Sequence, residues 1–492
     1  MQNIKNKTSP GRILVIVHDV YQDDIQMPLG PAYLASVLRL AGHEVRIYSQ
    51  DVFHQSNKEL AGYLDDNEFD VIGLGFSAGR YVETIRPLAK IINQHKKNAK
   101  FILGGHGVTP IPEYILKDTR ADIAVLGEAE KVIGPLVKGI LNNQNLSEID
   151  GIAFRAGDKV AITKRIVPIM NLDEIPFPAW DLFPMEKYTN CFRFIGSKFS
   201  DKSFTVITSR GCINECSFCY RLEKGIRLRS INNVFEELKY LTAKYGITYF
   251  RFSDEMFIPS KNRIKEFALM LKKLPTTVRY ACVSRVELAK DKDFLKILKD
   301  SGCQFLNLGL ESLDQNVLNL MGKNTRVEDN YQAVENTIEA GIRPGLNFLW
   351  ANPGDSKKSI EDIVKFLIKY DTLAQLRTIR PPTPFPGSPL YYKAIQEKKI
   401  TGPADFFNKF KNSDRLTVNF TDMSDEEAHS VLLEANSTLI THHFNARVKL
   451  FKEDKKECDA KAKEMIESFR KVYFPKKKSD LKFRGARHYL KK

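Results

Sequence analysis

Short apolar runs alternate with amphipathic stretches over the first third of the chain. The runs cover residues 12–17, 43–48, 70–76, 100–103 and 122–126, and stretches with helical periodicity, such as 31–41 and 82–94, lie between them. Runs dense in Val, Ile, Leu and Phe that alternate with helices are typical of a parallel sheet covered on both faces. The pattern therefore predicts a doubly wound, Rossmann-like α/β domain over residues 11–165.

A second α/β series begins after a proline-rich stretch. Residues 166–200 contain Pro168, Pro176, Pro178 and Pro184, and we expect an irregular linker there. Beyond it, apolar runs at 203–208, 249–252, 278–282, 305–308, 345–348 and 377–379 alternate with helical stretches such as 234–245, 294–300 and 327–340. These six units predict an open, partial (β/α)6 barrel of TIM type over residues 201–400.

The last part of the chain is increasingly charged. Helical patterns at 425–444 and 457–472 predict a mainly helical C-terminal domain over residues 401–475. Residues 476–492 form a basic tail, with eight Lys or Arg residues against the single acid Asp480, in a chain of net charge +15. Such a tail is either a solvated end or a contact for an acidic partner or lipid headgroups, and the sequence leaves both open.

Composition places the chain among globular proteins, because 43% of its residues are hydrophobic and 27% are charged. No apolar run approaches the ~18 residues of a membrane span, and the polar first twelve residues are unlike a secretory signal. We therefore expect a cytoplasmic protein, and we expect no nucleic acid as a partner.

Glycines follow several of the apolar runs in the first domain. Gly75, Gly104, Gly105 and Gly127 stand where the strands are expected to end, and ligands of doubly wound sheets bind outside those carboxyl ends. None of these segments matches the G-x-G-x-x-G fingerprint of dinucleotide-binding turns. The pattern therefore indicates a large ligand at this edge and disfavours a nicotinamide cofactor.

Three cysteines follow the first run of the second series. Cys212, Cys216 and Cys219 have the spacing C-x3-C-x2-C, so one loop supplies three thiolates. Three thiolates can hold a 4Fe-4S cluster and leave one iron open for a ligand. Zinc is the alternative, but zinc ribbons pair two C-x2-C knuckles to reach four ligands. The other four cysteines are isolated in the sequence and are expected to be ordinary residues: Cys191, Cys282, Cys303 and Cys458.

With this loop the sequence resembles the radical S-adenosylmethionine superfamily. The resemblance implies that a reduced 4Fe-4S cluster cleaves S-adenosylmethionine to a 5′-deoxyadenosyl radical, while the barrel orients the substrate. Further positions are similar to the segments that line the family's S-adenosylmethionine site, and here they are Tyr220, Ser253, Asp254, Glu255, Ser284, Arg285, Glu311 and Asn347. For Asp254 and Glu255 taken alone, helix capping is an equal alternative.

The first domain resembles the cobalamin-binding domain attached to this superfamily. The resemblance implies cobalamin contacts at Leu29, Gly30, Ser77, Gly79, Gly104, Gly105, His106, Gly107, Thr109 and Glu128. No Asp-x-His-x-x-Gly occurs, which is similar to the radical branch that binds cobalamin without a histidine on cobalt. His106 stands one place earlier than the family's histidine, so both a cobalamin contact and a plain loop position stay open for it. The same holds for His18 and Asp19, at the end of the first run.

Together the two resemblances imply a cobalamin-dependent radical S-adenosylmethionine enzyme, of the branch that includes anaerobic Mg-protoporphyrin ester cyclase-like and radical methyltransferase proteins. We expect methylation of an unactivated carbon or a phosphinate. The first alternative is cyclisation, oxidation or carbon–carbon bond formation with the same cofactors. A methylthiotransferase and a non-catalytic cobalamin or iron–sulfur sensor are lesser alternatives. Methylthiotransferases usually carry cluster cysteines in the first domain, and this chain has no cysteine before Cys191.

The sequence does not specify the substrate. The basic tail and the aromatic residues Phe406, Phe407 and Phe410 are compatible with a lipid, an anionic small molecule or a peptide. The resemblance also implies an external electron donor such as flavodoxin or ferredoxin. No residue is singled out as a catalytic acid or base.

Overall fold

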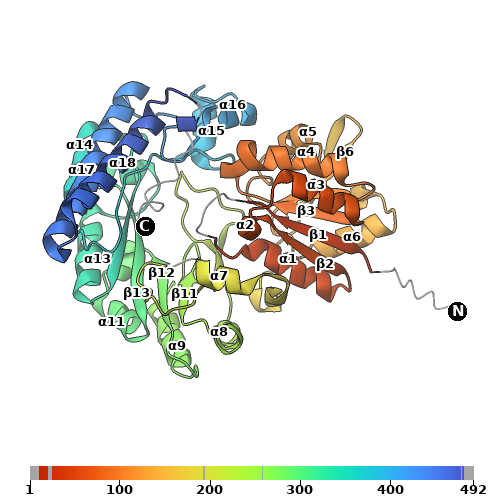
Figure 1. Ribbon diagram of the computed structural model, residues 1–492, viewed down its shortest axis with the longest axis horizontal. Helices are drawn as coiled ribbons and strands as arrows, with labels where there is room; N and C mark the ends of the chain where they lie inside the picture. The colour runs from red at the N-terminus through yellow and green to blue at the C-terminus, as the bar shows by residue number, and fades with distance from the viewer. Residues whose placement is uncertain (1–9, 20–24, 192–193, 258, 478, 481–492) are drawn as a thin grey trace. The chain divides into compact units, whose positions relative to one another are not determined.

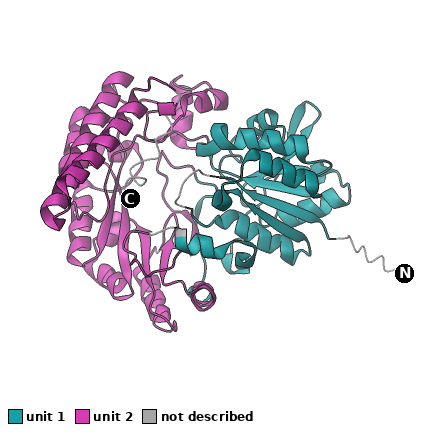
Figure 2. Cartoon of the chain, viewed as in Figure 1, with its two compact units in different colours: residues 1–192, 221–233 teal, residues 193–220, 234–492 magenta. Residues whose placement is uncertain are grey.

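The computed structural model describes residues 10–19, 25–191, 194–257, 259–477 and 479–480. The chain forms two compact units (Figure 2). Unit 1 contains residues 1–192 and 221–233, and unit 2 contains residues 193–220 and 234–492. The chain therefore leaves unit 2 directly after the cysteine loop, contributes thirteen residues to unit 1 and then returns.

Unit 1 is built on a seven-stranded sheet of order β2-β1-β3-β4-β5-β6-β7. The first five strands in this order are parallel, which confirms the doubly wound α/β prediction, and the last two form an antiparallel hairpin at one edge. The strands are β1 (Arg12–Val17), β2 (Glu44–Ser49), β3 (Val71–Gly75), β4 (Lys100–Gly104), β5 (Ile123–Val125), β6 (Ile152–Ala156) and β7 (Lys159–Ile162).

Helices cover both faces of this sheet (Figure 1). On one face, alternate strand residues such as Ile13, Val15 and Ile102 pack with Leu38 of α1 and Leu136 of α6 in one hydrophobic core. The period of two places the intervening residues on the opposite face. The helical segments are α1 (Leu29–Leu40), α2 (Gln50–Phe53), α3 (Asn57–Asp66), η1 (Ala78–Arg80), η2 (Tyr81–Ile85), α4 (Arg86–His95), α5 (Pro112–Thr119), α6 (Ile133–Leu141) and η3 (Leu146–Glu148).

The proline-rich stretch packs onto unit 1 with little regular structure. It contains η4 (Leu172–Glu174), η5 (Trp180–Leu182) and α7 (Met185–Cys191). The backbone N–H of Ala179 donates to the carbonyl of Ala32, and the Tyr188 hydroxyl donates to the buried carboxylate of Asp51 at 2.8 Å. These contacts make the stretch part of unit 1 up to residue 192.

Unit 2 is built on five parallel strands in the order β14-β13-β12-β11-β8. They are β8 (Ser203–Val206), β11 (Tyr249–Phe252), β12 (Arg279–Ser284), β13 (Cys303–Glu311) and β14 (Arg343–Phe348). Two further short strands, β9 (Ser209–Cys212) and β10 (Gly225–Leu228), flank the cysteine loop in the sequence.

The sixth barrel strand, expected at residues 377–379, is present only as a single bridge between Leu349 and Arg380. The side-chain amide of Asn436 explains the difference. Its Oδ1 accepts from the N–H of Ile379 at 2.8 Å, and its Nδ2 donates to the carbonyl of Ile379 at 3.0 Å. A side chain thus takes the hydrogen bonds that a neighbouring strand would otherwise supply.

The remaining regular elements of unit 2 are helices, as predicted for the C-terminal region. Figure 1 shows α17 and α18 side by side on the outside of unit 2. The helices are α8 (Ile231–Tyr245), α9 (Lys261–Leu271), α10 (Val286–Ala289), α11 (Lys292–Asp300), α12 (Gln315–Leu320), α13 (Val327–Glu339), α14 (Lys357–Lys369), α15 (Pro389–Gln396), α16 (Pro403–Lys409), α17 (Asp425–Phe451) and α18 (Lys455–Tyr473).

No helix within the described residues is both long and apolar enough to cross a membrane. Most of the basic tail lies outside those residues, which include only 476, 477, 479 and 480 of it.

Candidate functional site

The start of the cysteine loop is fixed by a buried carboxylate. Asp254 follows β11, and its Oδ1 accepts from the N–H of Thr208 at 2.7 Å and from the hydroxyl of Ser209 at 2.6 Å. Burial raises the pKa of Asp254 to about 6. Its second oxygen, Oδ2, has no hydrogen-bond partner in the described part of the chain. Asp254 therefore holds the backbone that leads into Cys212.

The loop itself is tied to two neighbouring turns of unit 2. The N–H of Ser217 donates to the carbonyl of Met321 at 2.8 Å, and the carbonyl of Ser217 accepts from the N–H of Leu390 at 2.8 Å. Inside the loop, the N–H of Cys219 donates to the carbonyl of Cys216 at 3.2 Å. Both the N–H and the carbonyl of Ser217, in the middle of the loop, are therefore bonded to other segments of unit 2.

The three thiols differ in exposure, since Cys216 is buried, Cys212 is half-buried and Cys219 is exposed. Burial raises the pKa of the Cys216 thiol, and the positive charges of Lys323 and Arg285 oppose that shift. As the side chains stand, no three His, Cys, Asp or Glu residues of the described chain are grouped closely enough to hold a metal ion. The donor set nevertheless fits an iron–sulfur cluster, because one short loop carries three thiols and two cations lie near them.

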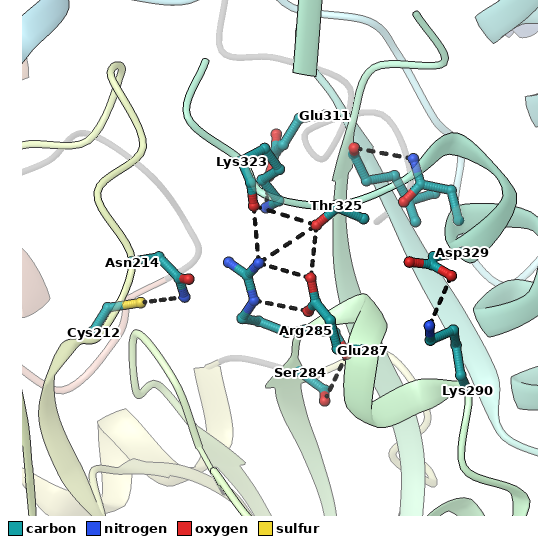
Figure 3. A network of polar contacts seen from close by, with 12 residues as sticks. Cys212, Asn214, Ser284, Arg285, Glu287, Lys290, Glu311, Lys323, Thr325 and Asp329 are labelled. Carbon is teal, nitrogen blue, oxygen red and sulfur yellow. Dashed lines mark hydrogen bonds and ion pairs between the residues drawn. The ribbon is translucent and has the colours of Figure 1, made fainter. Parts of the chain in front are cut away.

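Figure 3 shows a network of charged and polar groups beside this loop. The Lys323 ammonium donates to Oε1 of Glu311 at 3.2 Å, and these side chains are only 9% and 11% exposed. Arg285 donates to both carboxylate oxygens of Glu287 at 2.8 Å and to the carbonyl of Lys323 at 2.9 Å. Burial of Glu287 opposes ionisation, but the hydrogen bonds from Arg285 keep its pKa below the usual value.

The backbone of Glu311 is unusual for a residue with a side chain. Its φ is +66°, and the pairing of β13 with β14 shifts register between Gly309 and Glu311. A Cβ on Gly309 would lie 2.6 Å from Oε1 of Glu311 and 3.0 Å from the Lys323 ammonium. A side chain at position 309 would therefore force the buried Glu311–Lys323 pair to shift.

The structure brings the candidate S-adenosylmethionine residues to one edge of the unit 2 sheet. Ser253 and Glu255 follow β11, Ser284 and Arg285 end or follow β12, Glu311 ends β13 and Asn347 lies in β14. Because these strands are parallel and adjacent, their carboxyl ends meet at the same edge. Tyr220 ends the cysteine loop and is the last residue of unit 2 before the chain enters unit 1.

Sequence reasoning missed three members of this network, namely Lys323, Glu287 and Thr325, whose hydroxyl donates to Oε1 of Glu287 at 2.8 Å. Lys323 lies in the turn between α12 and α13, and no local pattern marks a turn lysine as buried. The charge of the network suits a zwitterionic ligand, because a buried ammonium, a guanidinium and carboxylates complement an amino-acid group.

In unit 1 the candidate cobalamin residues lie at the carboxyl ends of adjacent strands. Leu29 and Gly30 begin α1, Ser77 and Gly79 follow β3, Gly104 ends β4 with Gly105, His106, Gly107 and Thr109 after it, and Glu128 follows β5. Glycines are frequent on this edge, and a Cβ at Gly30 would meet nothing within 4 Å. The edge therefore fits a large ligand that approaches the main chain.

The glycines after β4 also have a packing function. Gly105 has a φ of +97°, and a Cβ there would lie 2.9 Å from the carbonyl oxygen of Phe76. A Cβ at Gly107 would lie 2.5 Å from the ring of Phe76. The Thr109 hydroxyl accepts from the N–H of Gly127 at 3.1 Å and so joins the loops after β4 and β5.

Several polar side chains at this edge are engaged inside unit 1. Nδ1 of His54 lies 2.9 Å from Oδ2 of Asp19, which is buried, and His106 is exposed. Asp51, which follows β2, has a pKa raised to about 7 by burial, with the hydrogen bond from Tyr188 opposing the shift. Glu128 forms an ion pair with Arg227.

Other candidate residues take structural positions. Cys282 and Cys303 appear isolated in the sequence, but they lie on adjacent strands with sulfur atoms 3.9 Å apart, and both are buried. Phe406 packs against Phe407 and Phe410 in an aromatic cluster in which Phe406 and Phe407 are buried. This cluster belongs to the core of the C-terminal helices.

Two family models match this chain. The Radical SAM superfamily model matches residues 206–367, which include the cysteine loop and the ends of β11 to β14. The B12 binding domain model matches residues 15–137, which include every cobalamin candidate.

Two relatives with similar sequences are named as enzymes. The chain is 31% identical over 374 residues to an uncharacterized methyltransferase of Pyrococcus horikoshii, an alignment that covers 75% of this chain and 78% of the relative. It is 26% identical to the anaerobic magnesium-protoporphyrin IX monomethyl ester cyclase of Cereibacter sphaeroides, over 76% of this chain and 61% of the cyclase.

A solved structure shows the same fold. The cobalamin-dependent S-adenosylmethionine radical enzyme OxsB, with aqua-cobalamin and S-adenosylmethionine bound, superimposes with a TM-score of 0.72 at 16% identity. The superposition covers 94% of this chain and 72% of OxsB.

Proposed function

Because this chain belongs to the cobalamin-dependent radical S-adenosylmethionine enzymes, we propose that it transfers a methyl group to an unactivated carbon, or to a phosphinate, of a small-molecule substrate. Its cofactors are those of the family, namely a 4Fe-4S cluster, S-adenosylmethionine and cobalamin. The observation that carries the proposal is the Pyrococcus relative, which is a methyltransferase by name and aligns over most of both chains.

The cysteine loop supplies the cluster ligands in this proposal. Cys212, Cys216 and Cys219 hold three irons, and the loop's hydrogen bonds to the backbone of Met321 and Leu390 keep the thiolates in place. When bound, the reduced cluster supplies the electron that cleaves S-adenosylmethionine, and cobalamin supplies the chemistry of a methyl carrier.

The charged network orients S-adenosylmethionine. Glu255 and Glu311, at the ends of β11 and β13 on either side of β12, accept from its amino group, and Lys323 and Arg285 present positive charge to its carboxylate. Asp254 acts one step further back, because its hydrogen bonds to Thr208 and Ser209 fix the entry to the loop. The chain's own contribution is to bind and orient while the cofactors react.

The test uses protein reconstituted with iron, sulfide and cobalamin under anaerobic conditions, and reduced with dithionite in the presence of S-adenosylmethionine. We expect both 5′-deoxyadenosine and S-adenosylhomocysteine. S-adenosylhomocysteine should form without substrate and only when cobalamin is present, because transfer of a methyl group to reduced cobalamin consumes S-adenosylmethionine. If neither 5′-deoxyadenosine nor S-adenosylhomocysteine forms, the proposed enzymatic function is contradicted.

Cyclisation with the same cofactors is the second candidate, and the cyclase relative favours it. It predicts 5′-deoxyadenosine without cobalamin-dependent S-adenosylhomocysteine in the same assay. Under either reaction we propose that a flavodoxin or ferredoxin supplies the electron in the cell. Replacing dithionite with reduced flavodoxin should support cleavage.

A further inference from the structure

We propose that Glu128 is a positioning residue for the cysteine loop, acting through Arg227, and that it is not a cobalamin contact. The inference rests on the proposed cluster assignment of Cys212, Cys216 and Cys219. It reassigns a residue that the B12-type sequence motif places at the ligand edge of unit 1.

Glu128 and Arg227 form a two-pronged ion pair inside unit 1. Nη1 of Arg227 donates to Oε2 of Glu128 at 3.0 Å, and Nη2 donates to Oε1. The side chains are 10% and 7% exposed, so the pair is shielded from water. Nη1 of Arg227 also donates to the carbonyl of Ile169 at 2.7 Å. Because two parallel hydrogen bonds join the planar guanidinium to the planar carboxylate, the position of Arg227 is well defined.

Arg227 lies in the segment 221–233, which begins two residues after Cys219 and is part of unit 1. Other contacts secure the same segment to unit 1. Nη2 of Arg165 donates to Oε1 of Glu223 at 2.7 Å, and the N–H of Ser230 donates to Oδ1 of Asp173 at 2.9 Å. A Cβ at Gly127 would lie 3.2 Å from Oε1 of Glu223, so the turn before Glu128 packs directly on this segment.

The two ends of the cysteine loop are thus held by different parts of the protein. Asp254 of unit 2 holds the residues just before Cys212, and Glu128 of unit 1 holds the strand β10 that follows Cys219. Among these anchors the Glu128–Arg227 pair has the least exposed side chains on the Cys219 side. Loss of the Glu128 charge leaves the buried guanidinium of Arg227 without a counter-charge, with the carbonyl of Ile169 as its remaining acceptor, and so loosens that end of the loop.

The carboxylate is also poorly suited to touch cobalamin directly. Both of its oxygens are engaged by Arg227. A ligand group that displaced Arg227 would have to replace two charge-assisted hydrogen bonds.

Glu128→Gln tests the proposal, because it removes the charge and keeps the shape. Two measurements are made on cobalamin-loaded, cluster-reconstituted protein: the rate at which a chelator removes iron, followed by absorbance near 400 nm, and the electron paramagnetic resonance spectrum of the reduced cluster with and without S-adenosylmethionine. We expect iron loss about tenfold faster than in the wild type and an altered spectrum. Hydroxocobalamin affinity, titrated by absorbance on protein without the cluster, should stay within about twofold.

Two variants complete the experiment. Glu148→Gln makes the same change at an exposed position of unit 1 and should match the wild type in all three measurements. Arg227→Lys keeps the charge but loses the fork, and it should lie between wild type and Glu128→Gln in iron loss. It also keeps the test valid if Glu128→Gln folds poorly.

A fall in cobalamin affinity in Glu128→Gln, with iron loss at the wild-type rate, would overturn the proposal and make Glu128 a cobalamin contact. Iron loss in Glu128→Gln and Arg227→Lys equal to that of Glu148→Gln would also overturn it. A wild-type protein that assembles no cluster at all would instead contradict the proposed function.

Discussion

In unit 2 the carboxyl ends of β12 and β13 present charged side chains, whereas in unit 1 the ends of β3 and β4 present main chain. In unit 2 the charged side chains at this edge are those of Arg285, Glu311 and the nearby Lys323. In unit 1 the glycines after β4 pack on Phe76, and the acidic side chains Asp19 and Glu128 of that edge are engaged within the unit.

The difference follows from what each edge is suited to hold. A small zwitterion is recognised by charges that point at it. A large ring system needs flat, open backbone, which glycine provides. A side-chain site depends on the chemistry of single residues, and a main-chain site depends on the absence of side chains. Substitutions of the charged strand-end residues of unit 2 should therefore affect function, and substitutions of the glycines after β4 in unit 1 should affect folding.

The largest effect is expected when the thiols of unit 2 are removed. Replacing any one of Cys212, Cys216 or Cys219 with Ala should abolish the cluster's absorbance near 400 nm and all formation of 5′-deoxyadenosine, because two thiolates cannot hold the cluster. Cys303→Ala is the matched control, since Cys303 is buried beside Cys282. Retained cleavage in any of the three loop variants would contradict the assignment.

The next effect concerns the buried cation of unit 2. Lys323→Met should lower kcat/KM for S-adenosylmethionine about 10- to 100-fold, because it removes a charge from the site and leaves Glu311 buried without its partner. Initial rates of 5′-deoxyadenosine formation measure it. Lys290→Met is the control, since Lys290 pairs with Asp329 at 2.7 Å in the same view (Figure 3). Equal rates in the two variants would contradict the assignment of Lys323 to the S-adenosylmethionine site.

In unit 1 a smaller effect should appear, and it should be on stability. Gly107→Ala places a Cβ 2.5 Å from the ring of Phe76 and should destabilise the protein by about 2 kcal/mol, as overpacking does. Thermal unfolding followed by circular dichroism measures the change. At Gly134, in α6, a Cβ would meet nothing within 4 Å, so Gly134→Ala should be neutral or stabilising. Two variants with the same melting temperature would refute the packing argument.

The smallest expected effect is a pH dependence of the free energy of unfolding, caused by Asp51 of unit 1. Burial raises the pKa of Asp51 from its usual 3.8 to about 7, so the unfolded chain ionises this group more readily than the folded protein does. Stability is then lost as pH rises through the folded pKa. Between pH 6 and pH 8 the wild type should lose about 1 kcal/mol relative to Asp51→Asn, which does not titrate. Denaturant unfolding at the two pH values tests this, and parallel profiles would contradict it.

Local patterns predicted most of the fold. The five parallel strands of unit 1, the five of unit 2 and the C-terminal helices all follow from hydrophobic periodicity. The β6–β7 hairpin was missed although its turn at Gly157 and Asp158 separates short alternating runs, because two strands of this length give a weak signal. At Ile379 the apolar run suggested a strand, and the distant Asn436 took its hydrogen bonds.

The site was predictable where a motif fixes side-chain chemistry. The cysteine spacing and the ends of β11 to β14 identified residues that the structure brings to one edge. Partners distant in the chain were not predictable. Glu128 and Arg227 are 99 residues apart, and nothing near either residue indicates the other. Asp254 was grouped with Glu255 by sequence, but one is fully buried against the loop and the other is exposed.

Glu311 has a consequence for laboratory evolution of this protein. A left-handed conformation costs a residue with a side chain about 1 kcal/mol, and glycine adopts it freely. Glu311→Gly would remove that strain, but it would also leave the ammonium of Lys323 buried without its partner, which costs about 3 kcal/mol or more. A screen that rewards heat resistance should therefore retain Glu311 despite its strained backbone. Libraries meant to yield a sturdier catalyst should hold this codon fixed.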